Sequence, residues 1–166
     1  MQVNIALLTV TDTRTIDTDK SGAILVKKIK EQNHNLSVRK IVKDDKNEIK
    51  KILSDWLKND TLDVIITTGG TGLTGRDITP EVIKEIADKE IPGFGELFRE
   101  LSYKTIGTSA MQSRACAVLA NGKYIFALPG SLGGVTDAWE GILKYQLDIN
   151  HKPCNFVELF PRLKEK

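Results

Sequence analysis

The sequence is poor in cysteine and has no long apolar run. Its two cysteines, Cys116 and Cys154, stand far apart without a CxxC spacing, which argues against a disulfide framework and a thiolate metal site. No apolar run approaches the roughly 20 residues that cross a bilayer. The first residues, MQVNIALLTV, lack the basic start and the cleavage site of a signal peptide. We therefore expect a cytoplasmic protein.

Neither sign of charge is in excess. Lys and Arg number 24, Asp and Glu number 22, and the formal net charge is +2. Binding to nucleic acid needs a concentration of basic residues, so this balance predicts no nucleic-acid partner, and it predicts no membrane partner either. The length of 166 residues suits one domain, and no repeat or linker divides it. We expect a single domain over residues 1–166, in which residues 150–166 form a loose C-terminal tail.

Strand-like and helix-like patterns alternate along the chain. Residues 3–10 and 63–68 are nearly continuous apolar runs, typical of strands buried on both faces, and residues 36–42 alternate as a strand does. Residues 20–32 carry a weak helical stripe. A clear amphipathic helix is predicted by apolar residues at helical spacing, namely Ile49, Ile52, Leu53, Trp56 and Leu57.

The second half of the chain carries stronger turn and helix signals. Thr79 is predicted to cap a helix that begins with Pro80. Residues 91–113 are expected to form short helices joined by turns. The pair Asn121-Gly122 predicts a hairpin between two strands, and residues 135–147 a long helix with one apolar face.

Strands alternating with helices predict an α/β fold with a mostly parallel sheet covered on both sides, a three-layer αβα sandwich. In such sheets, ligands bind beyond the carboxyl ends of the strands. Four polar stretches follow predicted strands and should gather there: residues 11–19, 43–45, 69–79 and 129–134.

The stretch DVIITTGGTGLTGRDITPE places four glycines between Gly69 and Gly75, directly after a strand. It contains G-x-G-x-x-G, but the helix starts too late for a dinucleotide-binding motif and no acidic residue follows at the required spacing. As a P-loop it has Arg76 in place of lysine and Asp77 in place of Ser or Thr. A tight turn alone would need fewer glycines. Exposed backbone N–H groups in such a loop favour an anion, so we infer a phosphate-bearing ligand.

Two further elements follow strands. Gly130 allows close approach and Ser131 offers a hydroxyl at a helix start, where capping is an equally good interpretation. Asp44 and Asp45 precede a helix, and one of them is expected to cap it, which leaves the other free. If Asp44 and Asp77 meet beside phosphates, they form the kind of carboxylate pair that holds Mg²⁺.

The segment TSAMQSR is ambiguous. Ser109, Ser113 and Arg114 either support the structure or line the site, and their spacing favours neither interpretation.

The sequence resembles the MoaB/Mog family of molybdenum cofactor biosynthesis proteins over nearly its whole length. The resemblance rests on TTGGTGLTGRDITPE, LLTVTDTR, IVKDD and FALPGSLGGV, and on the middle segment GFGELFRELSYKTIGTSAMQSRA, which is most similar to the B branch of the family. It implies a three-layer αβα fold assembled as a homotrimer or homohexamer.

The resemblance also implies a function. Members of the family adenylylate molybdopterin with ATP and Mg²⁺, release pyrophosphate, and pass the product to a molybdate-inserting partner. The resemblance assigns catalysis and metal binding to Asp44 and Asp77. It assigns substrate binding to Gly69, Gly70, Thr71, Gly72, Pro129, Gly130 and Ser131. The alternative is a protein of the same pathway that binds molybdopterin or its precursor without adenylyl transfer.

Overall fold

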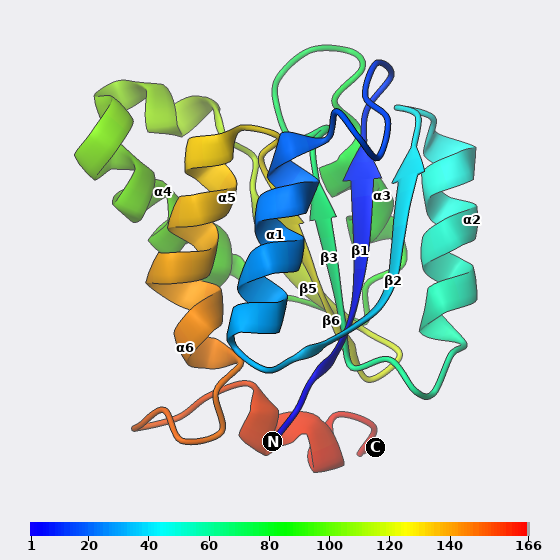
Figure 1. Cartoon of the computed structure of the whole chain (residues 1–166), viewed down its shortest axis with the longest axis vertical. Coiled ribbons are helices and arrows are strands. Elements are labelled where there is room, and N and C mark those ends of the chain that lie inside the picture. The colour runs from blue at the N-terminus through cyan, green and yellow to red at the C-terminus, as the bar shows by residue number, and fades with distance from the viewer. Residues whose placement is uncertain (166) are drawn as a thin grey trace.

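The computed structural model describes residues 1–165 and folds them into one sheet flanked by helices (Figure 1). None of the helices within this range is both long enough and apolar enough to cross a bilayer. In chain order the elements are β1 (Asn4–Val10), α1 (Lys20–Glu31), β2 (Asn35–Val42), α2 (Lys46–Leu57), β3 (Val64–Thr68), α3 (Thr79–Glu85), β4 (Lys89–Glu90), α4 (Pro92–Ile106), η1 (Gly107–Gln112), β5 (Cys116–Ala120), β6 (Lys123–Leu128), α5 (Leu132–Ala138), the π-helical η2 (Trp139–Leu143), α6 (Lys144–Gln146) and η3 (Val157–Arg162).

The sheet has the strand order β2-β1-β3-β6-β5-β4. The strands β2, β1, β3 and β6 are parallel, and β5 runs antiparallel to both of its neighbours. This confirms the mostly parallel α/β sheet. Val10 pairs with Val42, and Thr68 pairs with Leu128, so the four parallel strands end at one edge. We call it the C-terminal edge of the sheet.

Helices cover both faces of the sheet. Ile5 and Leu7 of β1 pack in one apolar cluster with residues of α1, α4 and α5, whereas Ala6 and Leu8 pack in a second cluster with residues of α2 and α3. Because successive strand residues point to opposite faces, a continuous apolar run is what a strand buried on both sides requires. Figure 1 shows α1 and α5 in front of the sheet and α3 behind it.

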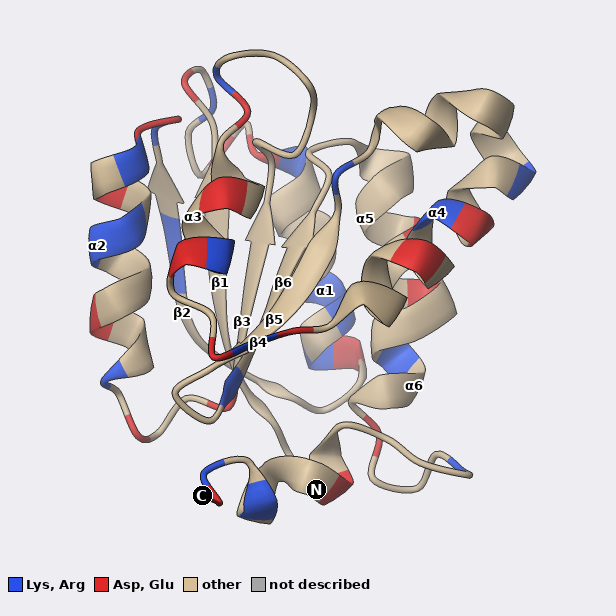
Figure 2. Ribbon diagram, turned by 180° about the vertical axis from the view of Figure 1, so that it is seen from behind, with Lys and Arg blue, Asp and Glu red and all other residues tan. Residues whose placement is uncertain are grey.

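Charged residues lie mainly on the outer surfaces. Figure 2 shows Lys, Arg, Asp and Glu along α2 and on the loops at the C-terminal edge, while the ribbons of β3 and β6 are nearly free of them. On α2 the charges stand opposite a buried stripe that includes Ile49 and Leu53. The amphipathic helix predicted from the sequence is therefore confirmed.

The Asn121-Gly122 hairpin is also confirmed. Both residues have positive φ, 46° and 70°, as the tight turn between β5 and β6 requires.

The segment 91–113 differs from the expected short helices. It forms one long helix, α4, followed by η1. Pro92 lies in the first turn, where its missing N–H is not needed. A Cβ at Gly95 would lie 2.6 Å from the carbonyl oxygen of Ala115, so this glycine lets α4 pack closely against the residue that precedes β5.

Two other predictions are wrong. Thr79 does not cap α3, because Ile78 occupies that position and the Thr79 hydroxyl donates to the Gly69 carbonyl at 3.0 Å. The expected loose tail is instead docked, at least over η3. Val157 is buried, and the ring of Phe156 lies 4.6 Å from that of Tyr124. Apolar contacts with the core order this segment.

Candidate functional site

The four polar stretches gather at the C-terminal edge of the sheet, as predicted. The backbone N–H of Asp44 donates to the carboxylate of Asp12 at 3.2 Å, and Arg76 pairs with the same carboxylate at 2.6 Å. The hydroxyl of Thr68 donates to the carbonyl of Pro129 at 2.8 Å. A Cβ at Gly130 would lie 3.4 Å from the Cα of Gly69, so residues 11–19, 43–45, 69–79 and 129–134 form one surface.

The glycine loop, residues 69–79, has a backbone that only glycine tolerates at its start. Gly69 and Gly70 have φ of +99° and +68°. A Cβ at Gly69 would lie 2.2 Å from the carbonyl oxygen of Val10, and one at Gly70 would lie 2.3 Å from the Thr79 hydroxyl oxygen. The first two glycines are therefore required by conformation and by space.

Arg114 holds the glycine loop from the other side. Its backbone N–H donates to the carbonyl of Thr71 at 3.0 Å, and its guanidinium donates to the carbonyls of Gly72 and Asp77 at 2.7 and 2.5 Å. The same guanidinium pairs with Glu81. Arg114 is thus a supporting residue of the loop. The sequence left its role open because its partners are backbone carbonyls, which no side-chain pattern reveals.

The two serines of the ambiguous segment have different positions. Ser113 lines the pocket described below. Ser109 is exposed on η1.

Asp77 closes the turn within the glycine loop. Its Oδ2 accepts hydrogen bonds from the backbone N–H and the hydroxyl of Thr74, at 2.9 and 2.7 Å. Burial raises the pKa of the Asp77 carboxyl, but the hydrogen bonds from Thr74 outweigh burial and hold this pKa below its usual value. The carboxylate is therefore ionised near neutral pH and faces Gly72, where an added Cβ would lie 2.8 Å from Oδ2.

Asp44 is the free member of the Asp44-Asp45 pair. Asp45 caps α2, because its carboxylate accepts from the N–H groups of Asn47 and Glu48 at 2.9 Å each. Burial raises the pKa of Asp44, and the negative charges of Asp12 and Asp77 raise it further. A Cβ at Gly70 would lie 3.2 Å from Asp44 Oδ1, so Asp44 adjoins the glycine loop at Gly70 as Asp77 does at Gly72.

A pocket of about 630 Å³ opens between the glycine loop and the late loop, residues 129–134. Most of the predicted site residues line it, but Asp44 does not. It lies next to Gly70, outside the pocket lining. The predicted residues that line the pocket are Gly69, Gly70, Thr71, Gly72, Asp77, Pro129, Gly130 and Ser131.

Ser131 combines two of the interpretations left open by the sequence. Its Oγ caps α5 by accepting the N–H of Gly134 at 3.1 Å. That bond does not use the hydroxyl hydrogen, and within residues 1–165 the hydroxyl donates to no acceptor, so it is available as a donor to a ligand. Gly130 lies against Gly69, since a Cβ there would be 3.4 Å from the Gly69 Cα.

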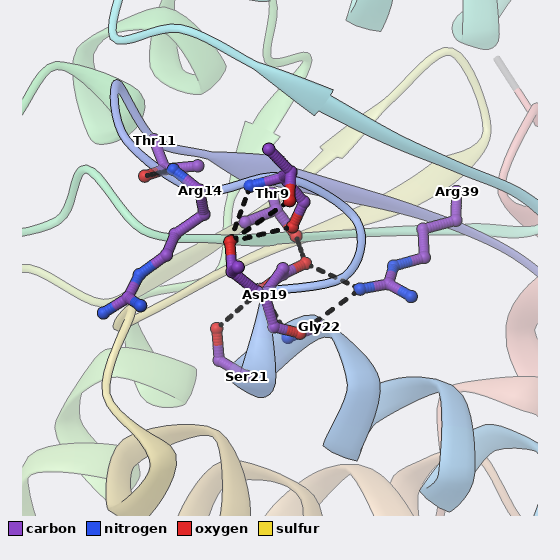
Figure 3. A network of polar contacts seen from close by, with 9 residues as sticks. Thr9, Thr11, Arg14, Asp19, Ser21, Gly22 and Arg39 are labelled. Atoms are coloured by element: carbon purple, nitrogen blue, oxygen red, sulfur yellow. Dashed lines mark hydrogen bonds and ion pairs between the residues drawn. The ribbon is translucent and has the colours of Figure 1, made fainter.

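A buried network that the sequence did not reveal supports the neighbouring loop 11–19 (Figure 3). Asp19 is 2% exposed and caps α1. Its carboxylate accepts from the Thr9 hydroxyl at 2.6 Å, from the Gly22 N–H at 2.9 Å and from Arg39 at 2.9 Å. The capping role of Asp19 could have been predicted, because an aspartate directly before a helical stripe is a common helix start. Its ion pair with Arg39 on β2 could not, because nothing in the sequence indicates that contact.

Replacing Asp19 with asparagine is expected to lower the free energy of unfolding by about 2 kcal/mol at pH 7, because charge-assisted hydrogen bonds are lost. Burial raises the pKa of Asp19, but the bonds from Thr9 and Arg39 outweigh it and hold the pKa below its usual value. The stability that Asp19 contributes is thus present above about pH 4 and is lost as pH falls further. Urea unfolding at pH 7 and at pH 3 measures both effects.

The control is Asp17→Asn, which removes the same charge from an exposed position of the same loop. The wild type and Asp17→Asn should lose stability on acidification, and Asp19→Asn should lose less. Equal acid sensitivity of all three proteins would contradict this role of Asp19.

Comparison with known proteins gives consistent matches. Residues 6–148 match the family described as "Probable molybdopterin binding domain". Molybdenum cofactor biosynthesis protein B of Escherichia coli (strain K12) is 44% identical over 161 residues, which cover 97% of this chain and 93% of that protein. A crystal structure of a molybdenum cofactor biosynthesis protein B has a TM-score of 0.89 and 39% identity, covering 100% of this chain and 98% of the other. The tungsten cofactor synthesizing protein MoaB from Pyrococcus furiosus has a TM-score of 0.77 and 36% identity, covering 86% and 91%.

Proposed function

This chain belongs to the family described as "Probable molybdopterin binding domain", and from that membership and the geometry of the C-terminal edge we propose that it acts in molybdenum cofactor biosynthesis. It binds molybdopterin and ATP, transfers the adenylyl group to molybdopterin and releases pyrophosphate. The observation that carries the proposal is the glycine loop: it borders a pocket of about 630 Å³ and has a carboxylate at each of two glycines, Asp44 at Gly70 and Asp77 at Gly72.

The transfer step needs positioning more than a strong base. A phosphate oxygen of molybdopterin attacks the α-phosphorus of ATP, a P–O bond forms, and the bond to the bridging oxygen breaks as pyrophosphate leaves with the electron pair. The attacking oxygen is already anionic, so no proton has to be removed. Backbone N–H groups of the glycine loop orient the phosphates, and the Ser131 hydroxyl donates to one of them.

The residues present fit a magnesium ion. Mg²⁺ is usually held by one or two carboxylates, with phosphate oxygens and water completing its octahedron. The raised pKa of Asp44 reflects burial and neighbouring negative charge, both of which a cation would offset. Within residues 1–165 no three His, Cys, Asp or Glu side chains form a metal cluster, which suits an ion that takes most of its ligands from substrates. Bound there, Mg²⁺ would neutralise the negative charge between the two substrates.

We propose that the protein works as a homotrimer or homohexamer and that it hands its product to a molybdate-inserting protein. Support for self-association comes from large apolar side chains exposed on α4 and η1. Tyr103 is 61% exposed, Ile106 55% and Met111 80%.

A binding protein without transferase activity is the second candidate. The hydrogen bonds of Asp77 favour this binding protein, because Oδ2 of Asp77 already accepts two hydrogen bonds from Thr74 and is less free to bind a metal. Both candidates bind molybdopterin. Only the transferase consumes ATP.

The experiment that separates them measures pyrophosphate release from ATP in the presence of Mg²⁺ and molybdopterin, with molybdopterin binding measured in parallel. We expect the wild type to release pyrophosphate and Asp77→Asn to be much slower. If the wild type binds molybdopterin but releases pyrophosphate no faster than Asp77→Asn, the binding-protein function replaces the transferase.

A further inference from the structure

One wall of the pocket is a face of α5 on which a glycine, Gly133, lies next to an acidic residue, Asp137. Gly133 and Asp137 both line the pocket, and they are four residues apart on the helix, so they lie one above the other on the same face. A Cβ at Gly133 would meet nothing within 4 Å. The absence of a side chain at Gly133 therefore leaves open space beside the Asp137 carboxylate.

Asp137 has no partner for its charge in the part of the chain described. Its neighbours on the same helical stretch are engaged: the Thr136 hydroxyl donates to the Leu132 carbonyl at 2.8 Å, and Glu140 pairs with Lys28 and Lys144. Neither a cation nor a hydrogen-bond donor of residues 1–165 reaches the Asp137 carboxylate, although the side chain is only partly exposed. A partly exposed carboxylate without a protein partner can accept hydrogen bonds from a ligand that supplies donors.

The facing wall is partly apolar. It includes Phe98 and Ile106 of α4, the helix that lies beside α5 in Figure 1. A pocket lined by apolar groups and a carboxylate suits a flat ring whose face contacts the apolar groups and whose edge carries hydrogen-bond donors.

We propose that Asp137 is a specificity-determining residue that binds the 2-amino-4-oxopyrimidine edge of a pterin ring. That edge presents two adjacent N–H donors, the 2-amino group and N3–H, which match the two carboxylate oxygens as a guanidinium does. A ring with a carbonyl at position 2 would place an acceptor against the carboxylate and be rejected. The inference rests on the proposed function, because it takes the ligand of this pocket to be a pterin.

The test is a fluorescence titration of the protein with two rings, pterin and its 2-oxo analogue lumazine. The wild type should bind pterin at least about 10-fold more tightly. Asp137→Asn presents one donor and one acceptor, which suit the carbonyl and N3–H of lumazine. The ratio of pterin to lumazine affinity should therefore fall at least about 10-fold in this variant.

Two further variants serve as controls. Asp55→Asn removes the same charge from an exposed position on α2, on the other face of the sheet, and should keep the wild-type ratio. Gly133→Leu places a side chain in the open space beside Asp137 without positive φ, so it should fold normally and weaken the binding of both rings. Thermal unfolding verifies that each variant is folded.

An unchanged affinity ratio in folded Asp137→Asn would overturn the assignment of Asp137, while the proposed function would stand as long as the wild type binds molybdopterin. If the wild type binds neither pterin nor molybdopterin, both the assignment of Asp137 and the proposed function are overturned.

Discussion

Replacing Asp44 with asparagine is expected to lower the rate of pyrophosphate release at least about 100-fold, with little change in molybdopterin binding, because the charge opposite the metal and triphosphate is lost. Asparagine keeps the shape of the side chain and one acceptor oxygen, so the fold should be unaffected. Steady-state kinetics at saturating ATP and Mg²⁺ measures the effect.

The matched control is Asp45→Asn. It removes the same charge from the adjacent residue, and asparagine caps helices as well as aspartate does, so α2 should remain capped. We expect its rate to stay within about 3-fold of the wild type. Similar losses in the two variants would mean that bulk charge at this edge matters rather than Asp44 itself.

Replacing Gly69 with alanine is expected to lower the free energy of unfolding by roughly 4 kcal/mol. The backbone has φ of +99°, and the new Cβ would lie 2.2 Å from the carbonyl oxygen of Val10, a backbone atom that cannot move without displacing β1. Urea denaturation of the purified variant measures the loss.

Gly75→Ala is the comparison within the same loop. Its φ lies outside the positive range and an added Cβ meets nothing within 4 Å, so stability should change by less than about 1 kcal/mol. A Gly69→Ala protein as stable as Gly75→Ala would show that the start of the loop is not fixed as described.

The sheet could be predicted from the sequence because each strand carries its own signal. The apolar run of β3 and the turn residues Asn121 and Gly122 act locally, and the periodicity of side chains decides which face they occupy. The same holds for the gathering of polar loops, since parallel strands that end together bring their following residues together.

What could not be predicted depends on contacts between distant segments. Residues 91–113 were expected to form short helices, but Gly95 lies inside the long helix α4 and lets it approach Ala115, a contact that only the packed structure reveals. Arg114 acts on backbone carbonyls, and Arg39 acts on Asp19 from another strand. Phe156 and Val157 lie in the segment expected to be a loose tail, yet Val157 begins the short element η3. Their stability comes from the aromatic surface around Tyr124.

The central claim is that Asp44 and Asp77 jointly hold a metal bound to the triphosphate beside the glycine loop. The most direct test is a crystal structure with Mn²⁺ and α,β-methylene-ATP, in which anomalous scattering locates the metal. We predict a metal peak about 2 to 2.5 Å from carboxylate oxygens of both aspartates, with the triphosphate along Gly69 to Gly72. A metal and triphosphate found elsewhere, with both aspartates free of them, would contradict the account.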